Sequence, residues 1–337
     1  MSKVFGHKYE LYIGDSPKLI DKHTEPSAYT TDNALIFPIA HKTSSTPTGG
    51  EDYRTVGTSF IKITDPLQMV AKVTYSEAKT SGTSPQSASI NLYNLSPKTL
   101  EQINTDSIVI LNAGYESKGE EEQPPLSLAF SGTVDHISTQ QSGAEMITTL
   151  LCTEGGSAVK SIRFTKSYPA GRTYAFLLEQ MIKEFADNGI PLGSFSKTDR
   201  TSTSVQEQSV FSGKLSKCLT DLCSGINYVW YISRGKLHIQ PKDLPRRVDF
   251  LEVNPENIIE KIHPIKNKVG MATTDPVSTL KGIKFSTFFN GEVGLESYVR
   301  IAKGDFAGQY GVKKLDLHLN WADGPWTMTI TTEEVKT

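Results

Sequence analysis

Apolar and polar residues alternate along most of this chain with a period of two, the spacing of β-strands that bury one face. Around residue 90, for example, Ala88, Ile90 and Leu92 alternate with polar Ser89 and Asn91. Similar runs, separated by turn-forming residues, recur at 8–14, 33–40, 59–63, 67–79, 87–94, 108–115, 126–138 and 145–154. Short strands in this number predict a β-sandwich or a β-barrel.

One short helix is predicted inside this β-rich part, between the strands at 87–94 and 108–115. Ser96 can cap it, and Pro97 can occupy its first position, where a missing N–H costs nothing. Leu100 and Ile103 then fall on one face. The sequence therefore predicts a strand, a helix of barely two turns, and another strand.

The pattern changes after Gly156 to a helical period. A stripe ending in Asn188-Gly189 predicts a long amphipathic helix, made by Tyr174, Leu177, Leu178, Met181, Ile182 and Phe185. A second helix is predicted with Ser212 as its cap, Gly225 at its end, and a stripe of Leu215, Cys218, Leu219 and Leu222. The segment 227–240 then reads as a hairpin around Arg234-Gly235. Residues from about 157 to 245 thus predict a compact α+β unit.

The alternation of strands returns towards the C-terminus. Strands are predicted within 282–301, 310–320 and 325–335, with Leu315, Leu317 and Leu319 alternating against Asp316, His318 and Asn320. The predicted fold class is mainly β with an α+β insert. The predicted domains are a first β-barrel at 1–156, the α+β domain at 157–249 and a second, smaller β-barrel at 250–337. Polar loops at 41–57 and 116–125 are expected to be contact elements or to be disordered.

Composition narrows the possible functions. The chain is 37% hydrophobic with a mean hydropathy of -0.31, and it contains no apolar run of the roughly 20 residues that a membrane span requires. The first residues do not resemble a secretory signal, so folding in a cytoplasm is expected. A net charge of -2, from 35 basic and 37 acidic residues, argues against a dedicated nucleic-acid binder. Cys152, Cys218 and Cys223 form no CxxC pair and are expected to be reduced.

No catalytic, cofactor-binding or metal-binding residue is predicted. The histidines occur singly, at 7, 23, 41, 136, 238, 263 and 318, without the spacing of metal ligands. Nucleophile-elbow and phosphate-loop motifs are absent from the sequence. Cys218 and Cys223, five residues apart, are expected on different faces of their helix, as core and rim residues. Trp321 and Trp326 flank a turn and are expected to plug a core.

The order of these motifs resembles a known family. The segments ASINLYNLSPKTLEQI, IVILNAGYES, AFSGTVDHI and TTLLCTEGG are similar to the first barrel of baseplate hub proteins from contractile-tailed bacteriophages. These hubs are related to tail-tube proteins and to the hub part of type VI secretion spike proteins. SYPAGRTYAFLLEQMIKEF and FSGKLSKCLTDLCSGINYVWYISRGKLHIQPKD resemble the middle domain of such hubs, and YGVKKLDLHLNWADGPWTMTI resembles the end of their second barrel.

The resemblance implies two tail-tube-like barrels flanking the α+β domain, and a short helix that crosses between barrel strands. It implies a structural, non-enzymatic homotrimer that adapts the sixfold tail tube to the threefold spike. The expected partners are the tail tube ring, the central spike, the baseplate wedge proteins and the tape-measure protein, with DNA passing through the lumen without specific binding and no membrane contact. The expected location is the virion tail, assembled in the cytoplasm of the host bacterium. Two alternatives stay open: a tail-associated cell-wall hydrolase and a carbohydrate-binding tail-tip protein.

Overall fold

The computed structural model describes residues 5–14, 60–64, 67–76, 86–117, 125–155, 159, 161–188, 190–233, 235–242, 250–253, 255–266, 280–295, 297–322 and 324–334. The strand predicted at 33–40 and the loop predicted at 41–57 lie outside these residues. So do most of the loop predicted at 116–125, and His23 and His41.

The N-terminal part of the chain is an antiparallel sheet, here called the N-terminal lobe. Its strands are β1 (Phe5–Gly14), β2 (Phe60–Thr64), β3 (Met69–Ser76), β4 (Ser87–Tyr93), β5 (Ile108–Ser117), β6 (Ser127–Ser142) and β7 (Glu145–Thr153). They are hydrogen-bonded in the order β3-β4-β7-β6-β5-β1-β2. Along β3 and β4 every second residue is buried, as the alternation predicts.

The short helix predicted in this lobe is α1 (Pro97–Leu100). The Ser96 side chain accepts a hydrogen bond from the Thr99 N–H, and Pro97 begins the helix, as predicted. The helix is a single turn, shorter than the two turns predicted, and it buries none of its own residues. Ile103, just beyond it, is buried in the core of the lobe. The segment therefore crosses the end of the sheet and closes the core with one side chain.

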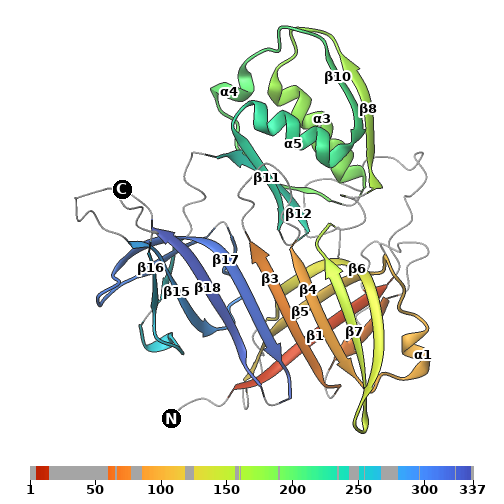
Figure 1. Cartoon of the computed structure of the whole chain (residues 1–337), viewed down its shortest axis with the longest axis vertical. Coiled ribbons are helices and arrows are strands. Elements are labelled where there is room, and N and C mark those ends of the chain that lie inside the picture. Colours follow the sequence, from red (N-terminus) through yellow and green to blue (C-terminus); the bar gives the residue numbers. More distant parts are fainter. Residues whose placement is uncertain are drawn as a thin grey trace, which may run out of the picture.

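The middle of the chain folds as a separate α+β unit, at the top of Figure 1. Its elements are β8 (Arg163–Tyr168), α3 (Tyr174–Asp187), β9 (Leu192–Phe195), α4 (Asp199–Ser202), β10 (Ser209–Lys214), α5 (Leu215–Gly225), β11 (Tyr228–Ser233) and β12 (Lys236–Pro241). Helices α3 and α5, β11 and β12 agree with the sequence prediction. The buried faces of α3 and α5 share one hydrophobic core, which includes Phe185, Leu219 and the fully buried Trp230.

Two details of α5 differ from the prediction. Lys214, not Ser212, is the residue before the helix, because Ser212 still lies in β10 opposite Thr165. Cys223 is fully buried, and Cys218 is buried as well. Both sides of α5 are covered, so residues on different faces of the helix are both inside the unit.

The C-terminal part, here called the C-terminal lobe, contains β13 (Phe250–Val253), a 3-10 turn (Pro255–Asn257), β14 (His263–Lys266), β15 (Leu280–Phe288), β16 (Tyr298–Ile301), β17 (Gly308–Asn320) and β18 (Trp326–Glu334). Leu315, Leu317 and Leu319 are buried, as their alternation predicts. An isolated bridge between Ile258 and Thr287 links the segment after β13 back to β15. The bridge lies on the same edge of β15 that pairs with β14, so residues from Ile258 to β14 run along one edge of β15.

The two lobes are joined edge to edge. β17 pairs with β3 antiparallel from Lys314↔Ser76 to Asn320↔Val70, which makes one 13-stranded sheet. In Figure 1 the blue strand β17 lies beside the orange strand β3. One hydrophobic core extends through both lobes, from Tyr9 and Ile90 to Phe285 and Ile330. The chain is thus mainly β with an α+β insert.

The lobes repeat one strand topology. The N-terminal order β3-β4-β7-β6-β5-β1 corresponds to the C-terminal order β14-β15-β18-β17-β16-β13, with the strands in the same sequence along the chain. Even the irregularities match, because β6 has a bulge between Val134 and His136 and β17 has one between Val312 and Lys314. One difference is that β13 pairs with β16 parallel, whereas β1 pairs with β5 antiparallel.

Candidate assembly surface

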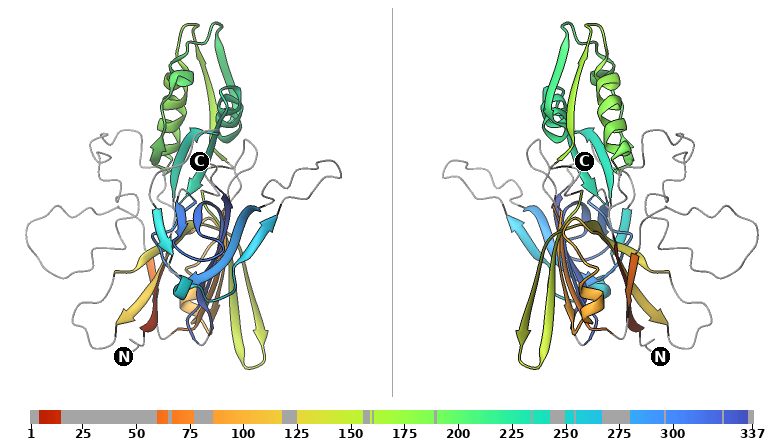
Figure 2. Two further views of the ribbon diagram at one scale, coloured as in Figure 1. Left: turned by 90° about the vertical axis from the view of Figure 1, so that its left-hand side faces the viewer. Right: turned by 90° about the vertical axis from the view of Figure 1, so that its right-hand side faces the viewer.

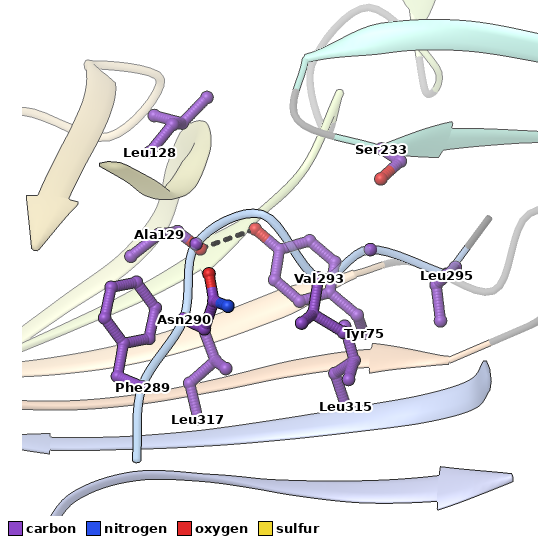
Figure 3. A pocket seen from close by; sticks show the side chains of 12 residues that line it. Tyr75, Leu128, Ala129, Ser233, Phe289, Asn290, Val293, Leu295, Leu315 and Leu317 are labelled. Atoms are coloured by element: carbon purple, nitrogen blue, oxygen red, sulfur yellow. Dashed lines mark hydrogen bonds between the residues drawn. The ribbon is translucent and has the colours of Figure 1, made fainter. Parts of the chain in front are cut away.

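The described residues hold no group of three or more His, Cys, Asp and Glu side chains that could bind a metal ion. A cavity of about 10 Å³ lies where the lobes meet the α+β unit, lined by Tyr75, Ser233, Phe289 and Leu317 among others (Figure 3). This volume corresponds to about one water molecule, so the cavity is a packing defect and offers no room for a substrate. None of the described helices is long and apolar enough to cross a membrane.

The histidines predicted in strands do lie in strands, and the structure does not bring them together. His136 and His318 lie on β6 and β17 and are exposed. His238 lies on β12, within hydrogen-bonding distance of the Ser194 hydroxyl at 3.0 Å, and it stacks on Tyr231. Trp326 is buried in the core, and Trp321 packs against that core, as predicted for both.

The junction of β3 and β17 shows how an edge strand of one lobe pairs with a strand of the other lobe. On its exposed face the Thr74 hydroxyl donates to Asp316 Oδ1 at 2.9 Å, and Lys314 Nζ contacts Asp316 Oδ2 at 2.6 Å. On its buried face Leu317 lies opposite Val73. The junction therefore combines a hydrogen-bonded ladder, a polar outer face and an apolar inner face.

The buried face of the junction is tied to the rest of the N-terminal lobe. The Tyr75 hydroxyl donates to the Ala129 carbonyl on β6 at 2.7 Å, a contact visible in Figure 3. Both groups are buried, and a buried hydroxyl without a partner would cost about 1–3 kcal/mol. This hydrogen bond therefore fixes the distance between β3 and β6 across the core.

A second contact between the lobes involves β1 and β5. The His7 ring stacks on the Trp326 ring with centroids 4.8 Å apart. The Tyr115 hydroxyl donates to the Phe289 carbonyl at 3.2 Å. Burial raises the pKa of Tyr115 to about 12 and lowers the pKa of His7 from its ordinary value, so both groups are neutral at pH 7. The lobes are thus packed together at two places.

The face of the shared sheet that lies opposite the core is rich in Ser and Thr, and it also carries the exposed side chains of Phe288 and Leu151. One row of outward positions crosses seven paired strands from β15 to β6, formed by Phe288, Thr327, His318, Lys72, Ser89, Leu151 and His136. The next row contains Ser286, Thr329, Asp316, Thr74, Ser87 and Thr153. The opposite face carries the apolar core, so the sheet has one wet face and one dry face.

The hairpin β6–β7 extends beyond the body of the molecule, as Figure 2 shows at the base of both views. β5 pairs with β6 only as far as Thr133, and the Val134 N–H donates to the Ser107 carbonyl at 2.9 Å. From His136 to Ser142 the same edge of β6 carries no strand in the described part of the chain. An unpaired strand edge is a ready docking site for another strand.

The α+β unit is held on the N-terminal lobe at the end of β7. Glu154 is buried, and its Oε1 accepts a hydrogen bond from the Gly235 N–H at 2.8 Å. Gly155 has a φ of +63°, and a Cβ there would lie 2.5 Å from Ile232 Cδ1. The positive φ favours glycine here, and a Cβ would displace the Ile232 side chain of the β11–β12 hairpin.

Sequence reasoning identified the strands of the lobes and missed the junction between them. Thr74 and Asp316 meet across 242 residues, and neither strand carries a local signal for that partner. The matching bulges in β6 and β17 are likewise visible only after the strands are paired.

No protein family model matches this chain, and no curated protein is significantly similar to it. Among solved structures, the 43 kDa tail protein of prophage MuSo2 from Shewanella oneidensis matches with a TM-score of 0.56 and 7% identity, over 82% of this chain and 94% of that chain. A chain of the lidded Francisella PdpA-VgrG complex matches with a TM-score of 0.58 and 8% identity, over 99% of this chain and 53% of that chain.

A third similar structure is the Escherichia coli c3393 protein, a component of the type VI secretion system with structural similarity to the bacteriophage T4 tail proteins gp27 and gp5. It matches with a TM-score of 0.50 and 9% identity, over 80% of this chain and 74% of that chain. At such identities the likeness is one of fold. The chain thus has a fold found in phage tail proteins and in type VI secretion components, in agreement with the resemblance seen in its sequence.

Proposed function

We propose that this protein is the central structural hub of a phage tail baseplate, forming a homotrimeric ring that adapts a sixfold tail tube to a threefold spike. The observation that carries the proposal is the repeated lobe, joined to its copy by β3 and β17. Two similar lobes in each of three chains give six similar lobes. Such a ring can match a sixfold ring on one side and a threefold spike on the other.

The same geometry suggests which face lines the channel. A sheet that closes into a ring has an inner and an outer face, and the buried residues of both lobes form a core on one side of it. A packed core would fill the channel if it lay inside the ring. The core would therefore lie outside, and the Ser- and Thr-rich face would line the channel. Lys314 on that face is paired with Asp316. A cation paired in this way binds phosphate weakly, which suits the passage of DNA.

The proposed partners are those that a hub must contact: the tail tube ring, the central spike, the baseplate wedge proteins and the tape-measure protein. We retain the domain division 1–156, 157–249 and 250–337 as part of the proposal. The protein would reside in the virion tail after assembly in the host cytoplasm. No catalytic role is assigned, and the contractile character of the tail belongs to the proposal.

Electron microscopy of the purified chain tests this function. The proposal predicts threefold ring-shaped particles with six lobes around a central channel. Particles without a channel, or with two lobes only, would contradict it. A zymogram on bacterial cell wall, with lysozyme as the positive control, tests the hydrolase alternative, and a cleared band from this chain would favour that alternative.

A further inference from the structure

The repeat of the two lobes identifies a specific strand edge and its partner. In the C-terminal lobe, β16 pairs with β17 from Ile301↔Gly308 to Tyr298↔Gly311. Just beyond this ladder, the Val312 N–H donates to the Ser297 carbonyl at 3.1 Å. Beyond the bulge, the same edge of β17 passes to β3. β6 repeats this arrangement as far as the bulge, with the Val134 N–H bonded to Ser107. Past the bulge, its edge has no described strand.

We propose that residues 136–142 of β6 pair with β14 of the next copy of this chain, as residues 314–320 of β17 pair with β3. β14 is the strand of the C-terminal lobe that corresponds to β3. β14 pairs with β15, β3 pairs with β4, and β15 and β4 are equivalent strands of the two lobes. The inference rests on the proposed ring and names the strands that join its copies. The occupant of the edge is therefore a second copy, in a head-to-tail contact that closes into a ring.

The internal junction also supplies the register. His263 on β14 corresponds to Lys72 on β3, since they lie opposite the equivalent residues Lys284 and Ser89. Lys314 and His136 correspond, because each is the first paired residue after the bulge. His318 and Gln140 each lie four residues further along, so they correspond as well. Because Lys72 lies opposite His318, His263 of one copy is expected opposite Gln140 of the next.

The residues at the proposed contact suit an edge that is exposed before assembly. The inward positions Leu315, Leu317 and Leu319 of β17 correspond to Ile137, Thr139 and Gln141 of β6. Thr139 and Gln141 are exposed, whereas the three leucines are buried. Polar residues at these positions keep the single chain soluble.

Charge is also complementary in this register. Lys261, two residues before His263, is expected opposite Ser142 of the next copy. Ser142 lies opposite Glu145 in the turn of the hairpin. The register therefore brings a lysine of one copy close to a glutamate of the next.

Pro264 makes the proposed junction weaker than the internal one. The N–H and C=O of Ile283 both bond the Thr332 hydroxyl, on the β18 side. Pro264 lies opposite Ile283, so its backbone must point to the other edge of β14, where the described residues place no strand. There it offers a carbonyl and no N–H, and the ladder has one donor fewer than the ladder between β3 and β17. A proline on an edge strand also limits indiscriminate pairing.

Disulfide trapping tests the register. Directly opposite residues on antiparallel strands have Cα atoms about 4.5 or 5.5 Å apart, within the range of a disulfide. The double variant His263→Cys with Gln140→Cys should give covalent dimers and trimers after mild oxidation. The offset variant His263→Cys with Thr139→Cys should give at least about tenfold less, because adjacent residues face opposite sides of the sheet.

Matched controls make each result decisive. Lys72→Cys with His318→Cys should form a disulfide within one chain and no covalent oligomer, since this register is present in the structure. Lys261→Cys with Ser142→Cys is a second pair of exposed residues for the same junction. Light scattering before oxidation gives the oligomeric state. A trimer that neither pair cross-links would overturn the strand assignment and leave the ring intact, whereas a monomer would overturn both.

Discussion

Truncation of Leu317 to alanine tests whether the two lobes fold as one cooperative body. Leu317 is only 5% exposed and lies opposite Val73 of the other lobe. It also lines the small cavity described above, which the truncation would enlarge. Removal of a buried leucine side chain costs 2–5 kcal/mol, and we expect about 3 kcal/mol here.

Hydrogen exchange followed by mass spectrometry measures the effect in each lobe separately. If one core unites the lobes, exchange through global opening should accelerate by roughly a hundredfold in both, since 1.4 kcal/mol corresponds to a factor of ten. Peptides from β4 report on the N-terminal lobe, and peptides from β18 report on the C-terminal lobe. Peptides from α5 should change little, because the α+β unit has its own core.

The neighbouring residue gives the matched control. His318 lies on the same strand and is exposed, so His318→Ala should change stability by less than about 0.5 kcal/mol. Acceleration restricted to β15, β17 and β18, with β4 unchanged, would refute the single cooperative body. All samples need the same protein concentration, because assembly would stabilise the folded chain by mass action.

Three further predictions follow from buried groups. Burial raises the pKa of Cys152 and Cys223 to about 12, so a thiol reagent at pH 8 should label neither residue until the protein unfolds, and rapid labelling of the native protein would contradict this. Burial lowers the pKa of His7 from its ordinary value of 6.5, so the unfolded chain binds this proton first and stability should fall as the pH drops through about 6.5. His7→Phe should flatten this dependence in denaturant titrations, and an unchanged slope would exclude His7 as its source. Glu154→Ala removes the acceptor of the Gly235 N–H, so exchange at Gly235 should accelerate while exchange in β18 stays the same. Unchanged exchange at Gly235 would show that the hydrogen bond does not hold the unit.

Much of the secondary structure could be predicted from local patterns. The stripe in α3 buries Leu177, Leu178, Met181, Ile182 and Phe185, because 3.6-residue spacing survives in any packed helix. β8 was missed because only Phe164 is buried along it, which leaves no alternation to detect. The Ser212 cap was misplaced because a preceding strand occupies that residue. Local sequence does not show which element a capping residue belongs to.

The assembly surface could not be predicted, for a different physical reason. Strand pairing is set by partners that are distant in sequence, and alternation records only that a strand has a buried face. Lys72 and His318 carry no signal that they lie opposite each other. The edge at 136–142, which has no partner strand among the described residues, is recognisable only because β17 shows the same edge occupied. Pairing of the strands was therefore needed before any partner could be named.

The mass of the purified chain in solution, measured by light scattering across a range of concentrations, tests the central claim most directly. The account predicts a species of three times the 37.1 kDa chain mass at concentrations where assembly is complete. A mass of one or two chains at every concentration would contradict the trimeric hub.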